Sequence, residues 1–262
     1  MSKPIDSWKF GLYYRGMKLP TKLGKCPILE AFIEIHFKTD SVPDAVFGII
    51  YGALKTDFPK VVKLPIAQLP DEVRKGNPEL QKKPHFQLRG SDERHIVQVG
   101  PDVLTINNPN GYLGWTAYQV FFKSVWEKVV ETGVITDVER VGVRYVNFFK
   151  ENVFEKTKIK VQLVDDTLGN EETFLRSCLT KGIHQTNIHV TNRASVKRTE
   201  GMEVGSVIDI EAACSGKDVG AMAELPKSVE ETRLVAKELF FSLLNDDFLK
   251  SLEAEFEVNK RD

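Results

Sequence analysis

Apolar and polar residues alternate most regularly between Pro27 and Phe37. In Pro27-Ile-Leu-Glu-Ala-Phe-Ile-Glu-Ile-His-Phe37, one face holds Leu29, Ala31, Ile33, Ile35 and Phe37, and the other holds Glu30, Phe32, Glu34 and His36. Because successive side chains of a strand point to opposite faces, this pattern predicts a half-buried β-strand. The segment 138–149 predicts a second one, with Arg140, Gly142 and Arg144 on one face and Val141, Val143, Tyr145 and Phe149 on the other.

Shorter patterns predict the remaining elements. Further strands are expected at 86–89, 96–99, 103–107, 158–164, 174–179, 186–192 and 204–213. Apolar residues at helical spacing predict helices from about Ser41 to Phe58, Trp115 to Gly133 and Ser228 to Leu244, the last opened by the capping box Ser228-Val-Glu-Glu231. Four prolines predict an irregular connection over 60–84, and residues 192–198 predict a basic loop between strands.

Several strands in a row followed by a helix are typical of an α+β fold. We therefore expect an antiparallel or mixed sheet with amphipathic helices packed on one face. The pattern divides into a basic and aromatic N-terminal arm (1–25), a first α+β half (26–150) and a second α+β half (151–262) that ends in a long helix. The two halves are expected to form one compact unit. Each is a run of strands closed by a helix, so the two halves could have folds similar to each other.

Composition excludes several classes of protein. The chain has 262 residues, of which 42% are hydrophobic, and its 36 basic and 37 acidic residues give a net charge of −1. Such a balance provides no overall attraction to nucleic acid or to an anionic membrane. Its three cysteines lack Cys-x-x-Cys spacing, which favours a reducing compartment. No signal peptide and no apolar run of about 20 residues is seen, so we expect a cytoplasmic protein without a membrane partner.

The first 25 residues allow two interpretations. They carry six basic side chains and one acidic one, interleaved with Trp8, Phe10, Tyr13 and Tyr14. Cations and aromatic rings together can bind the phosphates and bases of nucleic acid. The favoured interpretation is that this arm packs against its own domain.

Five segments carry a family resemblance: residues 27–37, Val97-Gln-Val-Gly-Pro-Asp102, Gly111-Tyr-Leu-Gly-Trp115, Arg140-Val-Gly-Val-Arg-Tyr-Val-Asn147 and Ile208-Asp-Ile210. Together they resemble a sporadically distributed bacterial family of uncharacterised proteins. The resemblance spans nearly the whole chain from Cys26 onward. It implies no activity, cofactor or catalytic residue. One departure is Asn245-Asp246, where members tend to carry His-Asp.

Motifs for common catalytic chemistry are absent from the sequence. No phosphate-binding loop, dinucleotide turn or nucleophile elbow occurs, and the histidines lack metal-ligand spacing. Cys178 could pair with His184 or His189 as a nucleophile, but a small core residue is the favoured interpretation. We therefore expect no metal and no cofactor, and favour a ligand-binding or protein-interaction protein with an unknown small ligand or protein partner over an enzyme.

The candidate ligand-binding residues are Glu30, Glu34, Arg140, Arg144 and Tyr145. Glu30 and Glu34 are four residues apart, and so are Arg140 and Arg144, so the two side chains of each pair lie on the same face of their strand. If the two strands are neighbours, the charges either form a structural ladder of ion pairs or line a polar cleft. In the second case the arginines could bind phosphate while the glutamates hold a metal, as in a phosphate-handling enzyme. Glu34-Ile-His-Phe-Lys38 resembles the Glu-x-Glu-x-Lys strand of triphosphate-tunnel enzymes, with His36 in place of the second Glu.

Overall fold

The computed structural model describes residues 19–77, 80–91, 94–109, 111–169, 172–198 and 201–256. Most of the predicted arm lies outside these residues, so its interpretation as a nucleic-acid-binding segment stays a prediction. The described end of the arm lies against its own chain: strand β1 (Lys22–Leu23) pairs with β13 (Ala254–Glu255). Leu19 and Leu23 also pack against apolar residues of the C-terminal helices.

A nine-stranded sheet organises the molecule, in the order β10-β11-β12-β7-β2-β6-β5-β4-β3. Every neighbouring pair is antiparallel. The strands are β2 (Ile28–Lys38), β3 (Lys60–Lys63), β4 (Phe86–Arg89), β5 (Ile96–Val99), β6 (Val103–Asn108), β7 (Asp137–Phe149), β10 (Phe174–Lys181), β11 (His184–Arg198) and β12 (Gly201–Ser215). A separate hairpin joins β8 (Val161–Leu163) to β9 (Asp166–Leu168). The predicted α+β fold with an antiparallel sheet is confirmed.

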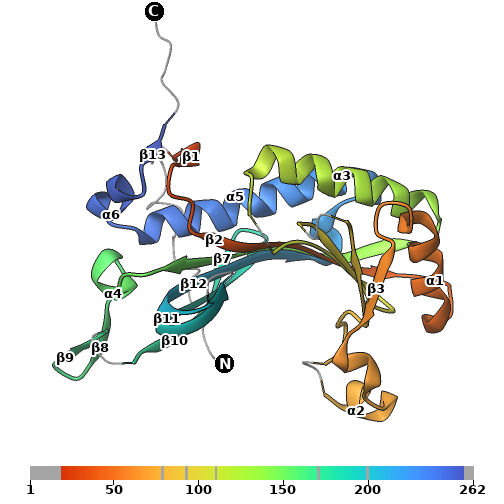
Figure 1. Ribbon diagram of the computed structural model, residues 1–262, viewed down its shortest axis with the longest axis horizontal. Coiled ribbons are helices and arrows are strands. Elements are labelled where there is room, and N and C mark those ends of the chain that lie inside the picture. Colours follow the sequence, from red (N-terminus) through yellow and green to blue (C-terminus); the bar gives the residue numbers. More distant parts are fainter. Residues whose placement is uncertain are drawn as a thin grey trace, which may run out of the picture.

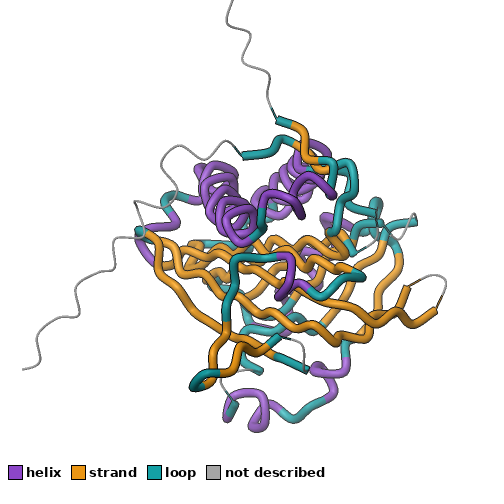
Figure 2. The backbone as a smooth tube through the Cα atoms, turned by 90° about the vertical axis from the view of Figure 1, so that its left-hand side faces the viewer, coloured by secondary structure: helices purple, strands orange, loops and turns teal. Residues whose placement is uncertain are grey.

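Two long helices, α3 (Trp115–Glu131) and α5 (Leu225–Leu243), lie on the same face of the sheet (Figures 1 and 2). Helix α1 (Pro43–Leu54) packs beside α3, and the short helices are α2 (Asp71–Gly76), α4 (Val153–Lys156) and α6 (Asp246–Ser251). Apolar side chains of the strands fill the space below the helices in two clusters. No described helix is long and apolar enough to cross a membrane.

The sequence patterns located most elements, and the structure differs from them in several places. Residues 60–84 contain β3 and α2 between their prolines, because short elements fit where long ones do not. Helix α1 ends at Leu54, four residues before Phe58. Residues 192–198 continue strand β11 and are not a loop. Helix α5 begins at Leu225, so Ser228 is no cap, and its hydroxyl donates to the Val219 carbonyl.

Asn245 has a clear structural role at the start of α6. Its side-chain oxygen accepts a hydrogen bond from the Phe248 amide at 2.8 Å. Asn245 is therefore the N-cap of α6, and this cap satisfies one of the free amides that every helix start exposes.

Gly205 permits the close approach of β12 to the end of β7. A Cβ atom at this position would lie 2.3 Å from the Phe149 carbonyl oxygen, too close for any side chain. By contrast, a Cβ at the helical Gly52 would meet nothing within 4 Å.

We therefore predict that Gly205→Ala destabilises the fold by about 1–3 kcal/mol, since backbone atoms must move to admit the methyl group. The matched variant Gly52→Ala should be neutral or stabilise by up to about 1 kcal/mol, because alanine favours the helix. Urea denaturation of both variants measures the difference. Equal stability of the two would contradict this packing at Gly205.

Candidate functional site

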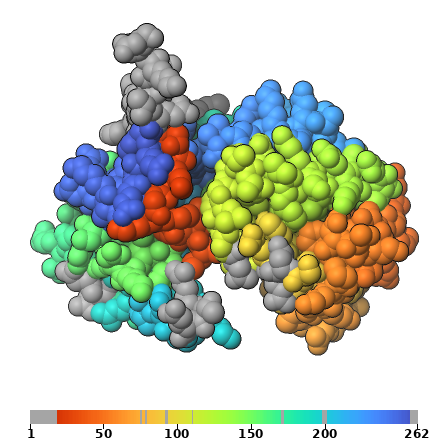
Figure 3. Space-filling model, turned by 45° about the horizontal axis from the view of Figure 1, so that its top comes forward, coloured from red at the N-terminus to blue at the C-terminus, as the bar shows by residue number. Residues whose placement is uncertain are grey.

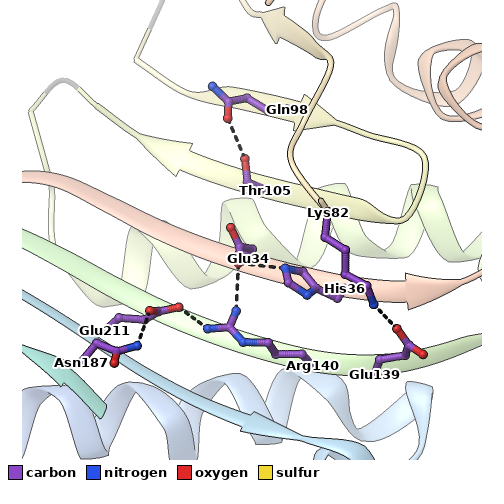
Figure 4. A network of polar contacts seen from close by, with 9 residues as sticks. All are labelled: Glu34, His36, Lys82, Gln98, Thr105, Glu139, Arg140, Asn187 and Glu211. Carbon is purple, nitrogen blue, oxygen red and sulfur yellow. Dashed lines mark hydrogen bonds and ion pairs between the residues drawn. The ribbon is translucent and has the colours of Figure 1, made fainter. Parts of the chain in front are cut away.

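The two faces of the sheet differ sharply in chemistry. Helices α3 and α5 cover one face, and the opposite face, called here the polar face, carries charged and amide side chains (Figure 4). Strand register brings nine of them together at its centre, from four adjacent strands. They are Glu30, Glu34 and His36 of β2, Arg140 and Arg144 of β7, Asp209 and Glu211 of β12, and Asn187 and His189 of β11.

Arg140 joins the strands on both sides of β7. Its Nη1 donates to Glu34 Oε1 at 2.9 Å, and its Nη2 donates to Glu211 Oε1 (Figure 4). The network extends at both ends, since His36 Nε2 lies 2.9 Å from Glu34 Oε1 and Asn187 Nδ2 donates to Glu211 Oε2 at 3.1 Å. The side chains of Arg140, Glu34 and Glu211 are each less than 30% exposed. Both terminal nitrogens of Arg140 are thus occupied by carboxylates.

Arg144 forms a second, separate ion pair. Its Nε and Nη2 donate to the two carboxylate oxygens of Asp209, at 2.8 and 2.5 Å, which is the bidentate geometry of a strong charge-assisted pair. The pair raises the pKa of Arg144. The guanidinium also lies over the Phe32 ring, 5.5 Å from its centroid. Asp209 additionally faces His189, whose Nδ1 lies 3.8 Å away.

Glu30 differs from the other carboxylates of the polar face. Among the described residues it has no hydrogen bond or ion pair, although Arg144 and Asp209 both act on it electrostatically. Burial raises the pKa of Glu30, and the attraction of Arg144 offsets this only in part. For Glu34 burial also raises the pKa, but the hydrogen bond from His36 and the charge of Arg140 outweigh it and leave the pKa lowered.

The structure brings together four of the five candidate residues. Strands β2 and β7 are neighbours, as the ladder required, but only Glu34 and Arg140 pair directly. Arg144 pairs with Asp209 of β12, not with a glutamate of β2. Tyr145 lies on the opposite face, where its ring contacts Tyr112 edge to face at 5.9 Å and packs against both apolar clusters.

Sequence reasoning missed Asp209, Glu211 and Asn187 as members of the site. A signal existed for the first two, because they alternate with Ile208, Ile210 and Ala212 and so share one face of β12. Their position beside Arg140 and Arg144 depends on the pairing of β12 with β7, about 65 residues away in sequence. No local pattern encodes such a pairing.

A pocket of about 530 Å³ lies at one margin of the polar face. Its wall includes the stacked rings of Phe47 and Phe86, whose centroids are 3.9 Å apart. Lys82 links this pocket to the face, because its Nζ donates to Glu139 of β7 (Figure 4). The described residues contain no group of three or more His, Cys, Asp or Glu side chains that could hold a metal ion.

No protein-family model matches the chain, and no curated protein matches it. The chemistry of the polar face therefore has to be inferred from its geometry. Glu34, Glu211 and Asp209 hold the two arginines of this face. Glu30 has no hydrogen bond or ion pair among the described residues.

We predict opposite effects for two matched variants at neutral pH. A carboxylate with a lowered folded-state pKa stabilises the fold above its unfolded-state pKa, and one with a raised pKa destabilises it there. Glu34→Gln should therefore lose about 1 kcal/mol of unfolding free energy, whereas Glu30→Gln should gain stability. The loss in Glu34→Gln should disappear only as the pH falls below about 4.3, the pKa of an unfolded glutamate, and through the lowered folded-state pKa of Glu34. The gain in Glu30→Gln should disappear earlier, as the pH falls through the raised folded-state pKa of Glu30 to about 4.3.

Urea denaturation of the two variants and the wild-type protein at pH 7 and at acid pH provides the measurement. A loss of stability in Glu30→Gln at pH 7 would show that Glu30 has a structural partner. The purely structural ladder would then account for the whole polar face.

Proposed function

We propose that this chain is a non-catalytic ligand-binding or protein-interaction protein whose contact surface is the polar face. The observation that carries the proposal is Glu30, a carboxylate on a partly buried surface that has no hydrogen bond or ion pair among the described residues, and whose pKa burial raises. Groups that destabilise a fold are commonly retained because they act on a ligand.

The shape of the molecule supports the same proposal. The sheet curves away from the helices, and the edges β10–β11 and β3 with α2 descend on opposite sides of the polar face (Figure 1). The space-filling view has a notch in its lower outline between these two sides (Figure 3). A concave surface with convergent polar groups is the usual form of a ligand site.

A phosphate-handling enzyme is the second candidate, because two arginines of β7 stand on the polar face, four residues apart. Phosphate recognition requires arginine nitrogens that are free to donate. Arg140 gives both terminal nitrogens to Glu34 and Glu211, and Arg144 gives Nε and Nη2 to Asp209. This occupancy leaves Arg140 Nε and Arg144 Nη1 as the nitrogens of the two guanidinium groups without a described partner, so it limits phosphate binding by the pair and favours the binding function.

We further propose that the protein is cytoplasmic and that it belongs to the bacterial family that its sequence resembles. Nucleic-acid binding by the arm is a further proposal, and it would reveal itself by an affinity that falls steeply with salt.

A defined library of small metabolites and short peptides should contain at least one compound that binds the polar face without being converted. Hydrogen–deuterium exchange mass spectrometry with each binder should show slower exchange in peptides covering β2, β7 and β12, while chromatography of the mixture shows no product. Phosphoesters and nucleotides, with and without Mg²⁺ or Mn²⁺, belong in the panel.

Metal-dependent turnover that is abolished in Arg144→Ala, with an unchanged circular dichroism spectrum, would overturn the non-catalytic proposal. Binding confined to peptides outside β2, β7 and β12 would overturn the polar face as the contact surface.

A further inference from the structure

The hydrogen-bond donors of the polar face are partly occupied. Arg140 and Arg144 together give four nitrogens to carboxylates of the neighbouring strands. Asn187 Nδ2 donates to Glu211, and Thr105 of β6 donates its hydroxyl to Gln98 Oε1 at 3.2 Å. Arg140 Nε and Arg144 Nη1 have no partner among the described residues, so a ligand that only accepts hydrogen bonds would find few free donors there.

Several hydrogen-bond acceptors of the polar face have no partner among the described residues. Besides Glu30, Asn107 of β6 is only 2% exposed, and its Oδ1 has no partner among the described residues. Register places Asn107 opposite Phe32, so both stand on the polar face. His189 Nε2 is likewise buried without a partner, and it is an acceptor when Nδ1 carries the proton toward Asp209. Buried polar atoms are rarely left unpaired, so these acceptors call for a donor from outside.

The charge at the centre of the polar face also favours a ligand that donates hydrogen bonds, because it is negative. Four carboxylates (Glu30, Glu34, Asp209 and Glu211) surround the two guanidinium groups of β7. Other cations lie at the margins: Lys83 acts on Glu34 from the pocket side, and Arg176 of β10 is in register with His189. The half-buried ring of Phe32, between Asn107 and Arg144, adds an aromatic surface of the kind that binds cations.

We infer that the polar face binds a donor-rich organic cation, a guanidinium or primary ammonium group, with Glu30 as its counter-charge and Asn107 Oδ1 as a further acceptor. This inference rests on the proposed binding function and specifies its ligand class. Such a group occurs both in free diamines and guanidines and in the arginine or lysine side chain of a polypeptide. A guanidinium fits best, because its planar array of donors can reach several acceptors at once.

Isothermal titration calorimetry at low ionic strength tests the inference with two probes. Agmatine represents the free cation, and a short amidated peptide with one central arginine represents the polypeptide source. The same peptide with citrulline in place of arginine has nearly the same shape without the charge, and should not bind. Tighter binding of the peptide than of agmatine would assign the site to a polypeptide, and the reverse would assign it to a free metabolite.

Glu30→Gln should weaken the better probe about tenfold or more, as expected for the loss of one charge-assisted contact of about 1.4 kcal/mol. Glu127→Gln is the matched control, because Glu127 is an exposed residue of α3 on the other side of the sheet, and it should bind like wild type. Since Glu30→Gln is expected to be the more stable protein, its loss of binding would not reflect misfolding.

Equal affinity of the Glu30→Gln and Glu127→Gln proteins, or equal binding of the citrulline peptide, would overturn the cation site. If neither cation binds while an anionic or neutral compound protects β2, β7 and β12 from exchange, the ligand class is wrong but the binding function stands. If no compound protects the polar face from exchange, both the cation site and the proposed binding function are overturned.

Discussion

A sheet covered by helices on only one face must make its other face compatible with water, and the arginines of β7 carry out that task here. Arg140 and Arg144 stand between carboxylates from the strands on either side, so the central three strands are joined by charge as well as by backbone hydrogen bonds. Because these side chains are partly buried, they are screened less by water than a surface pair, and removing one partner would leave the other desolvated. Three further polar side chains contact the paired carboxylates: His36, Asn187 and His189.

The arrangement is not complete as a purely structural device. Arg140 balances Glu34 and Glu211 through a shared network, and Arg144 balances Asp209, but Glu30 is left without a donor. The neighbouring Asn107 oxygen is also unpaired. Unpaired acceptors on adjacent strands, on the concave side of the sheet, are the features on which the proposed binding function rests. The organic cation we infer would supply both the charge and the donors.

Local periodicity was enough to predict the long strands β2 and β7, the meander β4–β6 and both covering helices, since each depends on the alternation of residues close in sequence. It also placed Glu34 and Arg140 on faces that meet. It failed where the outcome depends on distant parts of the chain: the pairing of β12 with β7 redirected Arg144 to Asp209, and the same register put Tyr145 beneath the helices beside Tyr112. The extension of β11 through the basic residues 192–198 was missed because β12 supplies its partner strand. Sequence patterns thus defined the faces, while strand order determined which charges meet.

The central claim is that the unpaired acceptors of the polar face exist for a cation. The most direct measurement is a crystal structure of the protein with the arginine peptide bound. We expect the guanidinium nitrogens of the ligand within about 3 Å of the Glu30 carboxylate, with the Arg140 and Arg144 ion pairs unchanged. A structure in which Glu30 instead pairs with an arginine of β7, or in which the peptide lies away from the polar face, would contradict the account.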